Sequence, residues 1–133
     1  MNQFELQEAQ TPEMKRLSFY KEQAAKTLSG EHVYASVYDD LKKTLVEAEE
    51  AGHDVSGIKA EIEEMIKRLP GAELNNILSK ADEFLKNGDI SMAKLWQADA
   101  ERRIRGWEEK GVLTNEELLE FQKRSNDLLS KFY

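Results

Sequence analysis

Glycine, proline and helix-capping residues interrupt this sequence at regular intervals and divide it into amphipathic segments. Thr11, Pro12 and Glu13 supply an N-cap, a proline at the first helical position and an acid near the positive end of the helix dipole. Thr114 and Glu117 have the spacing of a capping box. Six helices are therefore expected, at about residues 12–28, 31–51, 54–69, 72–87, 89–110 and 115–132, with either Asp54 or Ser56 opening the third.

Each segment carries apolar side chains at helical spacing on one face and charged side chains on the other, as helices that share a core do. Pro70 and Gly71 are expected to end the third helix. No stretch shows the alternation or the β-branched enrichment of a strand. We therefore predict an all-α fold of antiparallel hairpins, arranged either as a helical bundle or as a short open hairpin stack.

The chain has 133 residues, the length of one ordinary domain with a self-sufficient core. We expect an N-terminal arm over residues 1–11, with Phe4 and Leu6 as its apolar side chains, and a single helical domain over residues 12–133. The arm lacks the basic start and apolar run of a secretory signal, and no window has the apolar length of a membrane span. The expectation is a cytoplasmic protein without membrane contact.

Charge and residue composition exclude several functional classes. Lys and Arg number 19 against 26 Asp and Glu, for a formal net charge of −7, which argues against nucleic acid or anionic lipid binding over the whole surface. The absence of cysteine excludes thiolate metal sites, disulfides and cysteine nucleophiles. No phosphate-binding glycine motif and no nucleophile elbow occur, so we predict that the chain is not an enzyme and uses no cofactor.

Acidic residues and histidines are the remaining candidates for catalytic or metal-binding groups. Neighbouring acids such as Glu63 and Glu64 point about 100° apart on a helix, so they cannot share a proton. Glu50 and His53 have the Glu-x-x-His spacing of di-iron helical bundles, but such sites need two copies of the motif and this chain has one. No metal site is predicted, and His53 is expected at the surface just beyond a helix end.

Small and aromatic residues recur at fixed spacings within residues 77–100. These positions are Ala81, Phe84, Gly88, Ala93 and Ala100. In these spacings the segment resembles the middle of a tetratricopeptide repeat, which implies two antiparallel helices packed around small residues. Lys80 and Gln97 depart from that family's pattern, and no second copy at its period of about 34 residues is readable. Any tight helical hairpin selects small residues at its crossing, so kinship and convergent packing both stay open.

The expected fifth helix carries apolar residues on more than one face. Trp96 and Trp107 are eleven residues apart and project the same way, and they are predicted to be core anchors. Met92 and Leu95 lie off that stripe, on the side shared with Arg102. Such a helix either is central in the fold or presents a second contact surface.

The same helix contains the one dense basic cluster of the sequence, Arg102, Arg103 and Arg105. Three guanidinium groups so close together are suited to binding phosphates or an acidic partner. The alternative, which we favour, is that nearby acids neutralise them as intrahelical pairs. Those acids are Asp99, Glu101, Glu108 and Glu109.

These observations favour a non-enzymatic protein–protein interaction protein of the adaptor, assembly-chaperone, inhibitor or phage and bacterial accessory type. Its partner would be another protein or a second copy of itself. The alternative is a nucleic-acid-associated protein that uses the arginine cluster. The candidate partner-binding residues are Met92, Leu95, Arg102, Arg103, Arg105 and Phe19, the last lying opposite the apolar stripe of the first helix.

Overall fold

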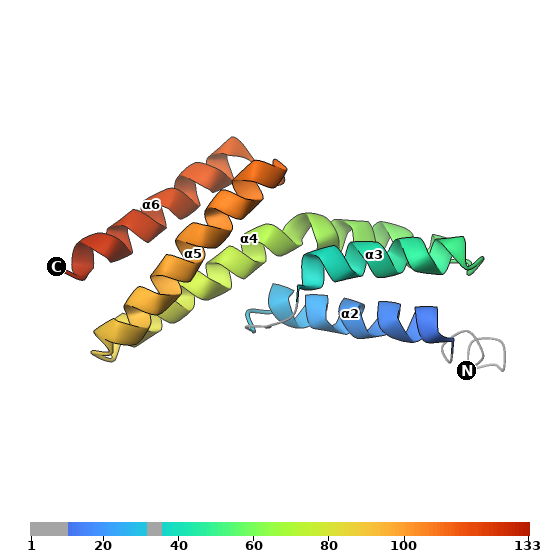
Figure 1. Ribbon diagram of the computed structural model, residues 1–133, viewed down its shortest axis with the longest axis horizontal. Coiled ribbons are helices and arrows are strands. Elements are labelled where there is room, and N and C mark those ends of the chain that lie inside the picture. Colours follow the sequence, from blue (N-terminus) through green and yellow to red (C-terminus); the bar gives the residue numbers. More distant parts are fainter. Residues whose placement is uncertain (1–10, 32–35) are drawn as a thin grey trace. The chain divides into compact units, whose positions relative to one another are not determined.

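A computed structural model describes residues 11–31 and 36–133, so all of the expected N-terminal arm except Thr11 lies outside the described residues. Over the described ranges the chain forms five α-helices and no strand, which confirms the all-α prediction. The helices are α2 (Pro12–Leu28), α3 (Val37–Glu50), α4 (Ser56–Lys86), α5 (Ile90–Lys110) and α6 (Asn115–Lys131) (Figure 1). In the described residues no helix combines the length and the apolarity that crossing a bilayer requires.

The predicted break at Pro70 is wrong, because α4 continues through it as one helix. A proline inside a helix removes one backbone hydrogen bond and costs about 3 kcal/mol in an isolated helix. Here the ring of Pro70 is fully buried, so the apolar surface that it removes from water offsets part of that cost. Tertiary packing has overridden a local helix-breaking signal.

The start expected for the second helix, at residue 31, is also wrong. The backbone N–H of Glu31 donates to the carbonyl of Lys26 at 3.0 Å, after Gly30 has turned the chain with a φ of 105°. Glu31 therefore belongs to the C-terminal closure of α2 rather than to the next helix. The helix α3 begins at Val37, and residues 32–35 lie outside the described part.

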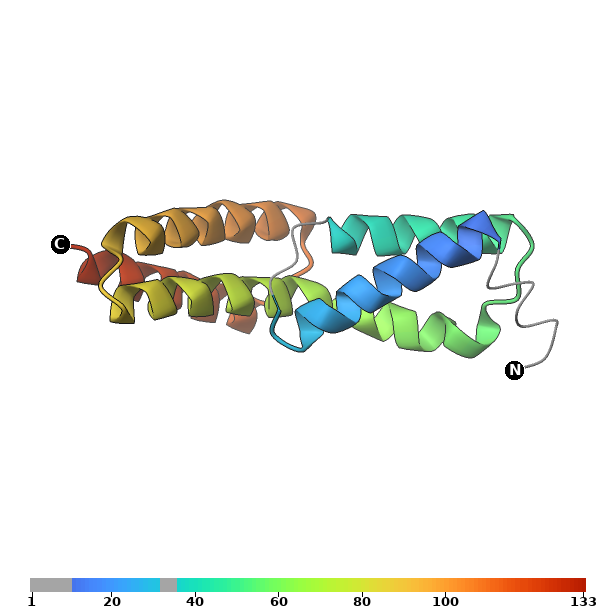
Figure 2. The same cartoon turned by 90° about the horizontal axis from the view of Figure 1, so that it is seen from below.

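The described residues divide into two compact units, one that ends at Leu69 and one that begins at Pro70, and α4 contributes to both. In the first unit α2 and α3 pack side by side with the first part of α4 (Figures 1 and 2). Its buried core residues are Leu17, Ala24, Val37, Leu41, Leu45, Ala48, Val55, Ile62 and Leu69. The predicted single domain over residues 12–133 stays a prediction.

The second unit contains the rest of α4 together with the α5–α6 hairpin, whose helices run antiparallel (Figure 1). Its buried apolar residues include Leu74, Ile77, Leu78 and Ala81 of α4, Ala93, Ala100, Ile104 and Trp107 of α5, and Phe121 and Leu128 of α6. At Gly71 a Cβ atom would lie 3.0 Å from Oε2 of Glu117, so the absence of a side chain lets α4 approach α6 closely.

Candidate functional site

The helix α5 is held at both ends by its own capping residues. Asp89 accepts a hydrogen bond from the backbone N–H of Met92 at 3.1 Å, and Gly111 ends the helix with a φ of 69°. The buried face of α5 consists of Ala93, Gln97, Ala100, Ile104 and Trp107. Leu95 points away from that face and is 65% exposed, whereas Met92 is half-buried. Of the two apolar candidates, Leu95 is the one that offers most of its surface to solvent.

The two tryptophans of α5 differ in burial. Trp107 is buried, and its indole N–H donates to Oε1 of Glu73 at 3.3 Å. Trp96 is only half-buried and stacks on Phe84, with the ring centroids 6.4 Å apart. The prediction of a buried anchor is therefore right for Trp107 and wrong for Trp96, because Trp96 lies at the edge of the α4–α5 contact.

Two of the three clustered arginines are ion-paired. Arg103 donates to Glu73 at 2.9 Å and to Asp99 at 3.2 Å, and Arg102 also donates to Asp99. Burial opposes the charge of Arg103, but Glu73 and then Asp99 outweigh it, so the pKa of this guanidinium lies above its usual value. The expected neutralisation within the helix is found at Asp99. Glu73 was missed because it lies on another helix, thirty residues away in the sequence.

Arg105 differs from the other two arginines. Within the described residues its side chain has no ion pair or hydrogen bond, and Glu101, one turn earlier on α5, has none either. Both side chains line a groove of about 300 Å³ on the α5–α6 hairpin. The full lining is Glu101, Ile104, Arg105, Gln122, Ser125 and Asn126. Ser125 is buried and accepts a hydrogen bond at 3.0 Å from the buried amide of Gln97.

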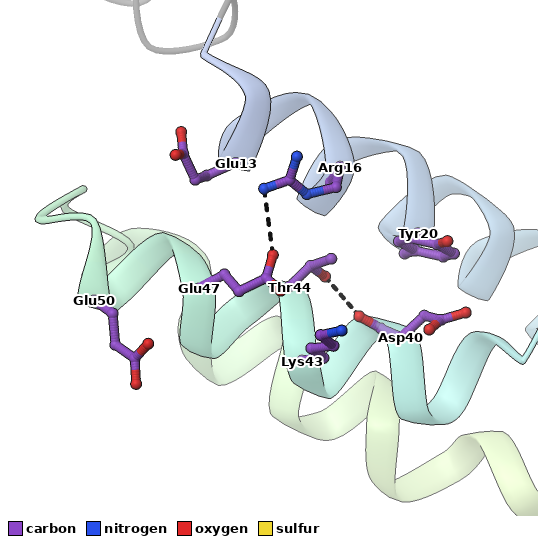
Figure 3. Close-up of a pocket in the computed structure, with 8 residues that line it drawn as sticks. All are labelled: Glu13, Arg16, Tyr20, Asp40, Lys43, Thr44, Glu47 and Glu50. Carbon is purple, nitrogen blue, oxygen red and sulfur yellow. Dashed lines mark hydrogen bonds and ion pairs between the residues drawn. The ribbon is translucent and has the colours of Figure 1, made fainter.

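A second open groove, of about 430 Å³, lies on the first unit between α2 and α3 (Figure 3). Its lining is Glu13, Arg16, Tyr20, Asp40, Lys43, Thr44, Glu47 and Glu50. Arg16 and Glu47 face each other across it at 3.4 Å, and Thr44 donates to the backbone carbonyl of Asp40 at 2.9 Å (Figure 3). Half of these eight side chains are acids.

Phe19, the candidate residue of the first unit, is 51% exposed. Its ring contacts Tyr20 edge-on, with centroids 5.1 Å apart, and Tyr20 in turn lines the α2–α3 groove. Phe19 and the α5 candidates lie in different units.

His53 contacts the start of α2 rather than the glutamate of its own motif. Its Nε2 atom lies 3.5 Å from Oε2 of Glu13 and 3.4 Å from the hydroxyl of Thr11. The pKa of Glu13 is lowered, mainly because a backbone N–H donates to its carboxylate; burial opposes this effect, and His53 adds to it. Among the described residues no group of three or more His, Asp or Glu side chains is arranged to hold a metal ion.

Comparison of the chain with protein-family models, with curated proteins and with solved structures finds no match. The segment that resembles a tetratricopeptide repeat does form a helical hairpin, with Gly88 at the turn and Ala81, Ala93 and Ala100 fully buried. Those features are expected both of a true tetratricopeptide repeat and of an unrelated tight helical hairpin.

Proposed function

We propose that this chain is a non-enzymatic protein that binds another protein, or a second copy of itself, through the exposed surface of α5. One observation carries the proposal. Leu95 is 65% exposed, and the side chain of Arg102, two turns further along the same face, is 75% exposed. An isolated exposed leucine is ordinary, but this one shares a helix face with an exposed arginine, a residue type that is enriched at protein interfaces.

The position of Arg102 supports its use in binding. Its guanidinium is oriented by Asp99, so less side-chain freedom is lost when a partner is bound. The neighbouring Arg103 is fixed by Glu73 and Asp99 and is less available. Leu95 and Arg102 therefore define the α5 outer face in this proposal.

The non-enzymatic part of the proposal is supported by the chemistry of the buried polar groups. In the described residues the buried polar side chains are all neutral: Thr27, Thr44, Asn76, Gln97 and Ser125. None of their buried side-chain N or O atoms lacks a hydrogen-bond partner. Catalytic acids and bases are commonly buried titratable groups, whereas the buried polar side chains of the described residues are hydroxyls and amides.

Nucleic-acid binding is the second candidate, and Arg105 is the observation that favours it, since this arginine has no partner in the described structure. Phosphate binding would have to compete with Asp99 and Glu73 for the other two arginines. A binding titration with duplex DNA and with RNA at 50 and 300 mM salt decides this question. Tight, salt-sensitive binding that Arg105→Gln abolishes would favour this second function.

The primary test uses two leucines that are matched in exposure. Leu95→Glu changes the α5 outer face, and Leu119→Glu makes the same change at a leucine of α6 that is 67% exposed. Partners captured from the native host by the tagged wild-type chain are identified by mass spectrometry, purified and titrated against the three proteins. We expect Leu95→Glu to weaken binding at least tenfold and Leu119→Glu to leave it unchanged. Equal effects of the two changes would contradict the proposal.

The cellular compartment is a separate expectation. The cytoplasmic location expected from the sequence stays a prediction, and fractionation of the native host with an antibody to the chain would test it.

A further inference from the structure

Glu101 and Arg105 have the spacing of an intrahelical ion pair but do not form one. Glutamate one turn before a basic residue is the favourable order for such a pair on a helix. Within the described residues neither side chain has a hydrogen bond or an ion pair, and both line the α5–α6 groove. The groove therefore presents one free anion and one free cation, about one helical turn apart.

The rest of the groove is suited to close contact. Ile104 and Ser125 are buried beneath it, and Gln122 and Asn126 of α6 add two amide groups that can both donate and accept. Leu129, one turn after Asn126 on α6, is a partly exposed apolar side chain. The buried bond between Gln97 and Ser125 holds the two helices together beneath this surface.

We propose that this groove is a self-association surface, in which the α5–α6 hairpin of one chain binds the same hairpin of a second copy about a two-fold axis. In a two-fold interface a contact between two positions occurs twice, with the roles of the chains exchanged. Arg105 of each copy then binds Glu101 of the other, and the amides of Gln122 and Asn126 bind across the same interface. The inference rests on the proposed function in that the bound partner is a protein, but it uses a different surface from the α5 outer face.

The charges of the groove favour the binding of a second copy of the hairpin over the binding of a simple anion. Glu101 repels a phosphate or a carboxylate that approaches Arg105, whereas a surface with one anion and one cation is complementary to its own copy. Exposed charge pairs contribute little each and are screened by salt. The dimer is therefore expected to be weak, and weaker at high salt than at low salt.

Charge reversal gives a test in which two disruptive variants rescue each other. Glu101→Arg and Arg105→Glu each place like charges opposite one another in both contacts of the two-fold interface. We expect each variant alone to raise the dimer dissociation constant at least tenfold, measured by sedimentation equilibrium at low salt. An equimolar mixture of the two should form a heterodimer, because both contacts then join Arg to Glu. The double variant should dimerise as the wild type does.

The control is Glu120→Arg, which makes the same charge reversal at an exposed glutamate of α6 outside the groove. It should leave the dissociation constant unchanged, and circular dichroism should show equal helicity for all variants because neither groove residue has a partner to lose. A monomeric wild type at millimolar concentration would overturn the inference, and so would a mixture that stays monomeric. Binding of host partners that depends on Leu95 tests the proposed function separately, so the failure of one is distinguishable from the failure of the other.

Discussion

The two units of this chain use polar side chains in different ways to join their helices. Both units have ion pairs between helices, such as Lys21 with Glu61 at 3.2 Å in the first and Arg103 with Glu73 at 2.9 Å in the second. In the second unit a neutral amide–hydroxyl bond between Gln97 and Ser125 is buried between α5 and α6.

This difference predicts which contacts matter for stability. Exposed ion pairs lose most of their strength to water and salt, so the alignment of α2 and α3 depends on their apolar core. A buried hydrogen bond is directional and costly to break, so the bond between Gln97 and Ser125 constrains how α5 and α6 align. The first unit should therefore tolerate polar substitutions that the second unit does not.

The largest expected effect separates the two tryptophans of the second unit. Trp107→Ala should lower the free energy of unfolding by roughly 3–5 kcal/mol, because it removes a buried aromatic ring and leaves Glu73 with one donor fewer. Trp96→Ala should cost clearly less, because its ring is already half-exposed. Urea titration followed by circular dichroism measures both values, and equal losses would show that Trp96 is an anchor after all.

The next prediction compares buried hydroxyl groups in the two units. Ser125→Ala should cost about 1–3 kcal/mol, because the buried amide of Gln97 then has no acceptor. Thr44→Val in the first unit should cost less, because the Thr44 hydroxyl donates only to carbonyls of its own helix. The double change of Ser125→Ala with Gln97→Leu should recover part of the loss. A larger loss at Thr44 than at Ser125 would contradict the comparison.

The amino-acid sequence predicted the helices better than the contacts between them. Capping residues are local signals, so the boundaries at Pro12 and Gly111 are found where they were expected. The helix end predicted at Pro70 was wrong because the burial that offsets the cost of a proline inside a helix depends on the tertiary fold. The order of residues around a proline does not show which other helices will bury it.

For the candidate surfaces too, the sequence predicted which side chains are exposed but not which residues of other helices they contact. Periodicity placed Leu95 away from the apolar stripe, and the structure has it exposed. The pairing of Glu73 with Arg103 and the free state of Arg105 depend on which helices are adjacent, and no spacing within one helix contains that information. Single-helix reasoning finds exposed side chains but not the partners that neutralise them.

A pH titration tests the polar contact at the start of α2. Because the pKa of Glu13 is lower in the folded chain than its usual value of 4.5, the folded state binds this proton less readily. The stability it contributes is fully present above the unfolded pKa and is lost as the pH falls through the folded pKa. The stability difference between wild type and Glu13→Gln should therefore shrink as the pH falls below about 4.5.

Substitution of His53 separates the two causes of that shift. His53→Gln should remove only part of the acid-dependent stability, because the backbone hydrogen bond is the larger cause and remains in place. Urea midpoints measured between pH 3 and pH 7 provide the comparison. If His53→Gln and Glu13→Gln had the same pH profile, the histidine rather than the backbone would be the main partner of Glu13.

The smallest effects are expected for exposed ion pairs. They test whether the stability that a polar contact contributes depends on its burial or on the unit in which it lies. Lys59→Gln removes a pair with Glu49 in the first unit, and Arg102→Gln removes a pair with Asp99 in the second. Each should change the free energy of unfolding by only about 0–1 kcal/mol, and the change should become smaller in 0.5 M salt, where the screening length falls to about 4 Å. Arg102 is the more exposed member of its pair, so its position in the second unit should give it no added effect. A loss at Arg102 as large as that at Ser125 would mean that the polar contacts of this unit act as one network whatever their exposure.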